Sequence, residues 1–90
     1  MELNGASILI TGGGSGIGAA TAAYLAERGS RVTISGRRAD KVRAVADAIG
    51  TQCCAVTGDV TVGADRERMV RDAVAHGGGL DALVNNAGNM

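Results

Sequence analysis

Two kinds of apolar pattern alternate along this 90-residue chain. Short runs of apolar or small residues are typical of buried strands, whereas longer segments with apolar residues at i, i+3, i+4 and i+7 are typical of helices. The short runs predict strands at residues 6–11, 31–35, 52–57 and 80–84. The longer segments predict three helices. The first spans residues 16–28, the second begins near residues 38–40 and runs to 49, and the third begins after Thr61, which is its predicted N-cap.

Glycines follow the predicted helices at the positions where helices commonly end. Gly29 and Gly50 close the first two, and the glycines at 77–79 close the third. The first helix has an apolar stripe that we expect to be buried, with Tyr24 as a packing residue. Its members are Ile17, Ala20, Thr21, Tyr24 and Leu25.

Alternation of strands and helices with short connections predicts a parallel sheet with right-handed crossovers. We expect an α/β, Rossmann-type doubly wound parallel sheet whose first four strands lie in the order 3-2-1-4. Such sheets bind ligands at the carboxyl ends of the strands, at the switch point between strands one and four. Residues 11–18 and 85–88 leave those two strands, so we expect them to converge on one crevice.

The loop after the first strand has the composition of a phosphate-binding site. Residues 11–18 read Thr-Gly-Gly-Gly-Ser-Gly-Ile-Gly. A helix N-terminus offers unpaired N–H groups and partial positive charge, and glycines let the backbone approach a phosphate closely. The alternative is a glycine-rich turn without a ligand. The residues predicted to bind a dinucleotide here are Gly12, Gly14, Ser15, Gly16, Ile17 and Gly18.

A second motif narrows the prediction. The T-G-x-x-x-G-I-G of residues 11–18 and the N-N-A-G of residues 85–88 together resemble the cofactor-site motifs of the short-chain dehydrogenase/reductase family. The resemblance extends to about Met90. It implies that the cofactor site includes Asn86, Ala87 and Gly88. A structural alternative for Asn86 is a side chain that ties neighbouring strands together, a role compatible with cofactor contact.

The same resemblance implies roles for two residues after the third strand. Asp59, followed by Val60, occupies the family position at which a carboxylate meets the adenine amino group. A solvated turn or cap residue is the structural alternative for Asp59.

The end of the second strand bears on the choice of cofactor. An acidic residue there binds the ribose 2′-hydroxyl of NAD, and an arginine accommodates the 2′-phosphate of NADP. The chain has Gly36 at this place, followed by Arg37 and Arg38 at a helix start. Cations at a helix N-terminus oppose its dipole by about 0.3–1 kcal/mol, and a bound phosphate would offset this. We therefore predict NADP, with NAD as the alternative; an exposed basic turn paired with Asp40 is the structural alternative.

No catalytic residue is predicted within the chain. The resemblance implies a catalytic Tyr, a Lys four residues later, a Ser and an Asn, all beyond the fourth strand. The only Tyr is Tyr24, the only Lys is Lys41, and His76 suits the end of the third helix as a cation near its dipole. We therefore expect residues 1–90 to be the cofactor-binding half-domain of a longer enzyme, truncated before its catalytic half and inactive alone.

Charge and composition give no support to several other functions. Nine basic and nine acidic residues cancel, so bulk charge favours neither nucleic acid nor a membrane surface. No apolar run approaches the roughly 20 residues that span a bilayer, and residues 1–5 lack the features of a secretion signal. Cys53 and Cys54 should point to opposite faces of a strand as packing residues, without a metal site. A cytoplasmic location is predicted.

The function expected is that of an NADP(H)-dependent oxidoreductase that transfers a hydride between nicotinamide and a small carbonyl or secondary-alcohol substrate. Its expected partners are the remainder of the enzyme chain and, when complete, further copies in a homo-oligomer. The alternative is a non-catalytic NADP(H)-binding regulatory or sensor module. A Y-x-x-x-K motif about seventy residues beyond Asn86 would decide for the enzyme.

Overall fold

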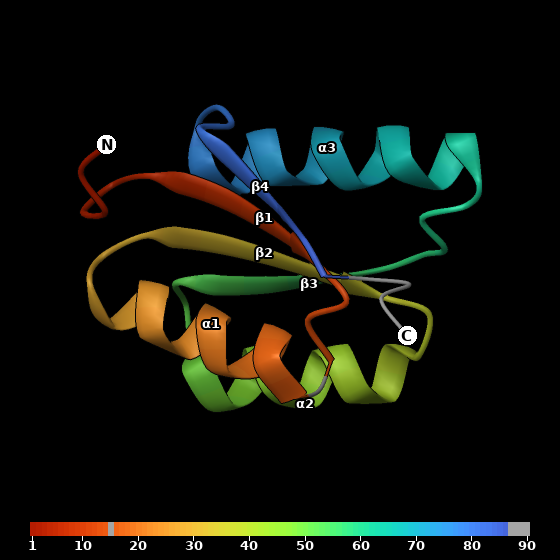
Figure 1. The fold of residues 1–90 in the computed structure, drawn as a ribbon, viewed down its shortest axis with the longest axis horizontal. Coiled ribbons are helices and arrows are strands. Elements are labelled where there is room, and N and C mark those ends of the chain that lie inside the picture. The colour runs from red at the N-terminus through yellow and green to blue at the C-terminus, as the bar shows by residue number, and fades with distance from the viewer. Residues whose placement is uncertain (15, 87–90) are drawn as a thin grey trace.

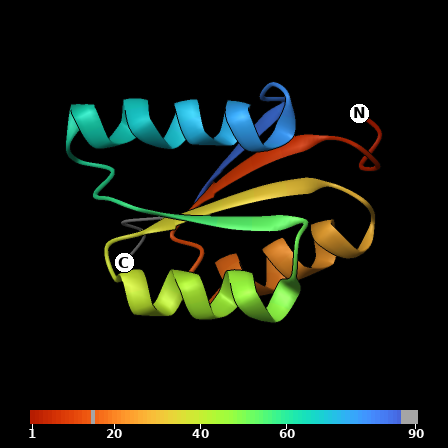
Figure 2. The same ribbon diagram turned by 180° about the vertical axis from the view of Figure 1, so that it is seen from behind.

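A parallel four-stranded sheet lies between two helical layers (Figure 1). The computed structural model describes residues 1–14 and 16–86. Strands and helices alternate along the chain, in the order β1 (Ser7–Thr11), α1 (Gly16–Glu27), β2 (Arg31–Gly36), α2 (Ala39–Ile49), β3 (Cys53–Thr57), α3 (Gly63–Gly77) and β4 (Ala82–Asn85). Helices α1 and α2 cover one face of the sheet and α3 covers the other, as the view from behind also shows (Figure 2).

The strand order is β3-β2-β1-β4, which confirms the predicted order 3-2-1-4. All three neighbouring pairs are parallel. The central strand β1 is buried along its whole length, because it has a strand on each side and helices above and below. In register, Leu9 lies opposite Thr33 on β2 and Leu83 on β4. The switch of direction between β1 and β4 is therefore where the sequence predicts it.

The two faces of the sheet carry cores of different size. The face toward α1 and α2 has the larger cluster of buried residues, which comprises Ala6, Ile8, Ile10, Ala22, Val32, Ile34, Val42, Ala46 and Cys53. The face toward α3 has a smaller cluster, which comprises Leu9, Val56, Met69 and Ala73. Burial in the larger cluster, together with a smaller contribution from the charge of the neighbouring Cys54, raises the pKa of the Cys53 thiol to about 12. Cys54 lies on the other face, where its sulfur is 3.5 Å from Thr33 Oγ1, as the strand alternation predicts.

The predicted buried stripe of α1 is wrong for most of its length. Ile17 and Tyr24 are 78% and 52% exposed, whereas the buried residues of the helix are Gly18 and Ala22. The guanidinium of Arg28, which directly follows the helix, stacks 3.4 Å from the centre of the Tyr24 ring. Small residues of α1 face the sheet because the helix approaches the backbone of the preceding loop closely, and this turns Ile17 and Tyr24 outward while Leu25 still packs against the core.

Several predicted element boundaries differ from the structure by one or two residues, and two of these differences have an identifiable cause. Val62, not Thr61, is the N-cap of α3, because the Thr61 hydroxyl donates to Asp59 instead of capping the helix. Strand β4 begins at Ala82, not at residue 80. Asp81 is held outside the strand, since its carboxylate accepts the Ser7 N–H at 2.8 Å.

The described residues contain no helix long and apolar enough to span a membrane. Within residues 1–14 and 16–86 there is also no group of three or more His, Cys, Asp or Glu side chains that could hold a metal ion.

Candidate cofactor-binding site

The loops that leave the four strands meet at the carboxyl edge of the sheet. The N–H of Asn86, after β4, donates to the carbonyl and to the hydroxyl of Thr11, each at 3.2 Å. The N–H of Gly58, after β3, donates to the Gly36 carbonyl at the end of β2 at 2.9 Å. Segments up to 75 residues apart in sequence therefore form one edge.

The glycine loop folds back onto β2. The N–H groups of Gly12 and Gly13 both donate to the Ser35 carbonyl, at 2.8 and 2.9 Å. Gly12 has a φ of 75°, a conformation that favours glycine. A Cβ atom on Gly13 would lie 2.7 Å from Cγ2 of Ile34, too close for any side chain there. Gly13 was not predicted as a site residue, although the third consecutive glycine was a signal for this close approach.

The first turn of α1 lies directly against the loop and the end of β4. A Cβ atom on Gly18 would collide with the Gly12 carbonyl oxygen and lie 2.8 Å from Nδ2 of Asn86. The same Asn86 amide donates to the Gly12 carbonyl at 3.1 Å. The structural role weighed for Asn86, a tie between neighbouring strands, is therefore present. The absence of a side chain at Gly18 allows loop, helix and β4 to meet at one point.

Two other predicted loop residues lie at the open side of this junction. Gly16 begins α1 with a φ of 57°, and a Cβ atom there would meet nothing within 4 Å. Ile17 follows it with an exposed side chain. The first N–H groups of a helix have no partner within the helix, so the start of α1 offers free donors beside an open surface. Ser15, Ala87 and Gly88, also predicted site residues, lie outside the described residues.

Thr11 links β1 to β4 through its side chain. Its hydroxyl donates to Oδ1 of Asn85 at 3.1 Å and accepts the Asn86 N–H. The motif T-G-x-x-x-G-I-G includes this threonine, but the sequence predicts no separate role for it. Its position before the glycines was the available signal.

A hollow of about 300 Å³ opens between the glycine loop and the start of α2. Its lining residues are Gly12, Gly14, Gly36, Arg37, Arg38, Lys41 and Val42. Added Cβ atoms would narrow it, since one on Gly14 would lie 3.3 Å from Cβ of Lys41 and one on Gly36 would lie 2.8 Å from Cγ1 of Val42.

Three cations surround this hollow and make it suited to an anion. Arg38 contacts Asp40 at 3.5 Å with both side chains largely exposed, so the local pairing weighed as an alternative is present for this arginine. Such exposed pairs contribute little to stability. Lys41, in the first turn of α2, was not predicted as a site residue. Its closeness in sequence to Arg37 and Arg38 was the available signal.

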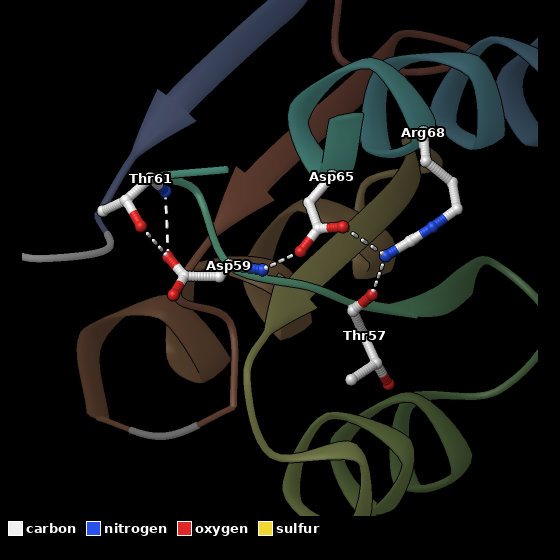
Figure 3. A network of polar contacts seen from close by, with 5 residues as sticks. All are labelled: Thr57, Asp59, Thr61, Asp65 and Arg68. Carbon is white, nitrogen blue, oxygen red and sulfur yellow. Dashed lines mark hydrogen bonds and ion pairs between the residues drawn. The ribbon is translucent and has the colours of Figure 1, made fainter. Parts of the chain in front are cut away.

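The carboxylate of Asp59 is held in a tight turn after β3 (Figure 3). Its Oδ1 atom accepts the Thr61 N–H at 2.9 Å and the Thr61 hydroxyl at 2.7 Å. These bonds, the backbone one first, lower the pKa of Asp59 below its ordinary value, and the charge of Arg37 lowers it slightly further. The turn weighed as an alternative for Asp59 is therefore present, and it orients the carboxylate.

Val60 lines a different, apolar pocket on the α3 face of the sheet. This pocket has a volume of about 270 Å³ and lies between α3 and β4, with Leu9, Met69 and Leu83 among its lining residues. Arg66 is the one cation among the described residues that line it, whereas three cations surround the hollow beside α2. The side chain of Val60 thus does not share a cavity with the predicted phosphate contacts.

The match of the sequence to known proteins agrees with this arrangement. Residues 6–90 match the family described as short chain dehydrogenase. The chain belongs to this family. The family resemblance drawn from the two motifs is thereby confirmed, and the similar solved structures include short-chain dehydrogenases.

Three similar proteins illustrate the relationship. Glucose 1-dehydrogenase of Gluconobacter oxydans is 41% identical over 88 residues, which cover 93% of this chain and 33% of the relative. The structure of glucose dehydrogenase of Caenorhabditis elegans in the apo form has a TM-score of 0.89 and 34% identity, and the match covers 100% of this chain and 40% of the other. The structure of 3-ketoacyl-(acyl-carrier-protein) reductase of Brucella melitensis, complexed with NADH, has a TM-score of 0.87 and 37% identity. The match covers 90% of this chain and 34% of the other. This short chain dehydrogenase sequence therefore spans about a third of the length of the curated relatives it matches.

Proposed function

We propose that this chain is the cofactor-binding part of an NADP(H)-dependent oxidoreductase that acts on a small carbonyl or secondary-alcohol substrate. The observation that carries the proposal is the junction of Gly12, Gly18 and Asn86 at the switch point, where side chains are missing and α1 begins. Such a junction brings backbone N–H donors and partial positive charge to an open surface, which suits a diphosphate. Family membership supports the same conclusion.

The residues present fit the other parts of such a cofactor. Arg37, Arg38 and Lys41 would hold a 2′-phosphate in the hollow beside α2, and the carboxylate of Asp59 would accept a hydrogen bond from the adenine amino group. By the family resemblance, the cofactor site would also include Asn86, Ala87 and Gly88. When bound, the nicotinamide supplies or accepts the hydride. The chain's own residues bind and orient it, and the catalytic acid and base belong to residues beyond Met90.

The preference for NADP is supported by charge. The strand end that carries an acid in NAD-binding sites has Gly36 here, and three cations surround the adjacent hollow. The relative from Brucella melitensis was solved with NADH, so NAD is the competing cofactor. We expect NADPH to bind more tightly than NADH.

The exposed edge of the sheet supports a longer enzyme. Among residues 1–14 and 16–86, strand β4 has a neighbouring strand on one side only, and its residues Leu83 and Val84 are 57% and 36% exposed. Open parallel edges with apolar side chains are usually paired or covered. We propose that the remainder of the enzyme covers this edge and supplies catalysis. Cytoplasmic location and homo-oligomerisation stay predictions.

Separate fluorescence titrations with NADPH and NADH test the proposal. We expect Arg37→Ala to weaken NADPH binding about ten-fold and leave NADH binding almost unchanged, because only NADPH carries the 2′-phosphate. Arg43→Ala, which removes an exposed cation further along α2, is the matched control and should change neither affinity. Equal affinities that Arg37→Ala does not alter would overturn the NADP assignment, and binding of neither cofactor would overturn the function.

A further inference from the structure

A carboxylate on α3 holds the backbone at the base of the Asp59 turn. The Asp59 N–H donates to Oδ2 of Asp65 at 2.8 Å. The other carboxylate oxygen of Asp65 lies 3.3 Å from Nη2 of Arg68, and the same nitrogen donates to the Thr57 carbonyl at 2.6 Å. Figure 3 shows these contacts as one chain from the end of β3 through α3 to the turn. We call Asp65 and Arg68 the α3 pair.

The α3 pair closes over a glycine. A Cβ atom on Gly58 would lie 3.1 Å from Nη2 of Arg68, 3.3 Å from Cβ of Asp65 and 2.8 Å from Cε of Met69. The absence of a side chain at Gly58 therefore lets the pair reach the backbone on both sides of it. The side chains of Arg68 and Asp65 are 37% and 29% exposed, so solvent screens this contact only in part.

The direction of the Asp59 carboxylate depends on this support. Thr61 binds Oδ1 of Asp59, and within residues 1–14 and 16–86 the second oxygen, Oδ2, accepts no hydrogen bond. Oδ2 is thus the atom with acceptor capacity toward a ligand. Because Thr61 belongs to the same short loop as Asp59, it fixes the carboxylate relative to the loop only. Asp65 and Arg68 connect that loop to β3 and α3.

We propose that Asp65 and Arg68 are positioning residues that determine how strongly Asp59 discriminates the 6-amino group of adenine. This inference rests on the proposed function, because it requires an adenine dinucleotide in the crevice. A hydrogen bond to a charged acceptor is sensitive to distance and angle, so displacement of the loop weakens recognition of the base even where the carboxylate itself is retained. A purely structural contact would change the stability of the fold without changing the choice between bases.

The test compares NADPH with reduced nicotinamide hypoxanthine dinucleotide phosphate, which has an oxygen in place of the amino group. Dissociation constants are measured for both with the full chain by fluorescence titration. We expect the unaltered chain to prefer NADPH about ten-fold. Asp65→Ala should reduce this ratio to about two-fold, and Arg68→Met, which keeps much of the apolar stem, should reduce it to about four-fold.

Asp72→Ala is the matched control. This acid lies two turns further along α3 and is also half-buried, and it should leave the ratio at about ten-fold. Rescue by Asp65→Glu, with a ratio between those of the unaltered chain and Asp65→Ala, would support positioning by the carboxylate. If circular dichroism shows that Asp65→Ala does not fold, the NADPH preference measured for Arg68→Met tests the proposal instead.

The failures of the two proposals are distinguishable. Binding of neither dinucleotide by the unaltered chain would overturn both. Tight binding of both with equal affinity would leave the cofactor site in place and overturn the inference about Asp59 and the α3 pair. Equal weakening of both dinucleotides in the Asp65 and Arg68 variants, with the ratio unchanged, would show a structural role and also overturn it.

Discussion

The two loops that frame the crevice are held in opposite ways. The loop after β1 can adopt its position because Gly13 and Gly18 have no side chain. Gly13 packs closely against Ile34, and Gly18 packs closely against the Gly12 carbonyl. The loop after β3 is positioned by side chains that are present, because Asp65 holds the N–H of Asp59 and Thr61 holds its carboxylate. A Cβ atom added to Gly13 or Gly18 should therefore disrupt the first loop. Removal of the Asp65 carboxylate should disrupt the second.

The difference follows from what each loop is proposed to recognise. A phosphate has several equivalent oxygens and can be bound by backbone N–H groups, provided that no Cβ atom separates them from it. The edge of a base offers one donor in one direction, so a side chain must carry the acceptor and must itself be oriented. Each of the following predictions tests one side of this comparison.

Gly18→Ala should have the largest effect. The new Cβ atom would collide with the Gly12 carbonyl, which is backbone and cannot rotate away. We expect a loss of about 1–3 kcal/mol in the free energy of unfolding, measured by urea denaturation, and a loss of NADPH binding of at least ten-fold. Gly63→Ala is the control, because its Cβ atom would lie 3.6 Å from the nearest side chain and should be neutral or slightly stabilising. Equal stability of both variants would contradict the close-approach argument.

Asn86→Asp should have the next largest effect. The substitution keeps the shape of the side chain but replaces the amide donor, now 3.1 Å from the Gly12 carbonyl, with an acceptor. Two acceptors then face each other, so we expect a loss of about 1–2 kcal/mol in the free energy of unfolding. Asn86→Ala, which removes the bond without repulsion, should cost less in the same denaturation experiment. The reverse order of the two variants would show that the amide does not tie β4 to the loop.

Thr61→Val should have a smaller effect, confined to the second loop. It removes the hydroxyl donor to Asp59 and keeps the backbone donor, which is the larger cause of the lowered pKa. We therefore expect the pKa of Asp59 to rise but to remain below its ordinary value, as followed by NMR titration of the carboxyl carbon. Thr57→Val, at the end of β3, is the control and should leave this pKa unchanged. If the pKa of Asp59 is unaltered in Thr61→Val, the Thr61 hydroxyl does not contribute to lowering that pKa.

The pH dependence should be the smallest effect near neutrality. The pKa of Asp59 is lowered in the folded chain, so its carboxylate contributes to stability above the ordinary Asp pKa of about 3.9. That contribution is lost only as the pH falls through the lower, folded value. Discrimination between NADPH and its hypoxanthine analogue should accordingly stay constant from pH 8 to about 5, measured by titration at each pH. A decline within that range would assign the acceptor role to another group.

The parts of the fold that follow from local pattern could be predicted. The strand order, the helix-ending glycines and the convergence of residues 11–18 with Asn86 all follow from strand–helix alternation and from turn chemistry. The wrong predictions concern orientation. Helix α1 is rich in alanine, so its apolar residues do not define one face, and the closest approach to the loop decided that Gly18 and Ala22 are buried.

The site could likewise be predicted only where a local motif marks it. Glycines and asparagines in a motif mark its position, but Lys41, Asp65 and Arg68 belong to no motif used here. Asp65 and Arg68 look like ordinary charged residues on an exposed helix, spaced for an i, i+3 ion pair. Their contacts with the Asp59 N–H and the Thr57 carbonyl exist only because α3 packs beside the end of β3.

By itself, the sequence determined the alternation of elements, the parallel sheet and the place of the crevice, because hydrophobic period and glycine conformation are local properties of the chain. Tertiary structure alone decided which face of α1 is buried, which side chains hold the Asp59 turn and how Asn86 reaches Gly12. These depend on distances between segments as far as 74 residues apart, and such distances are set by packing, which no local pattern encodes.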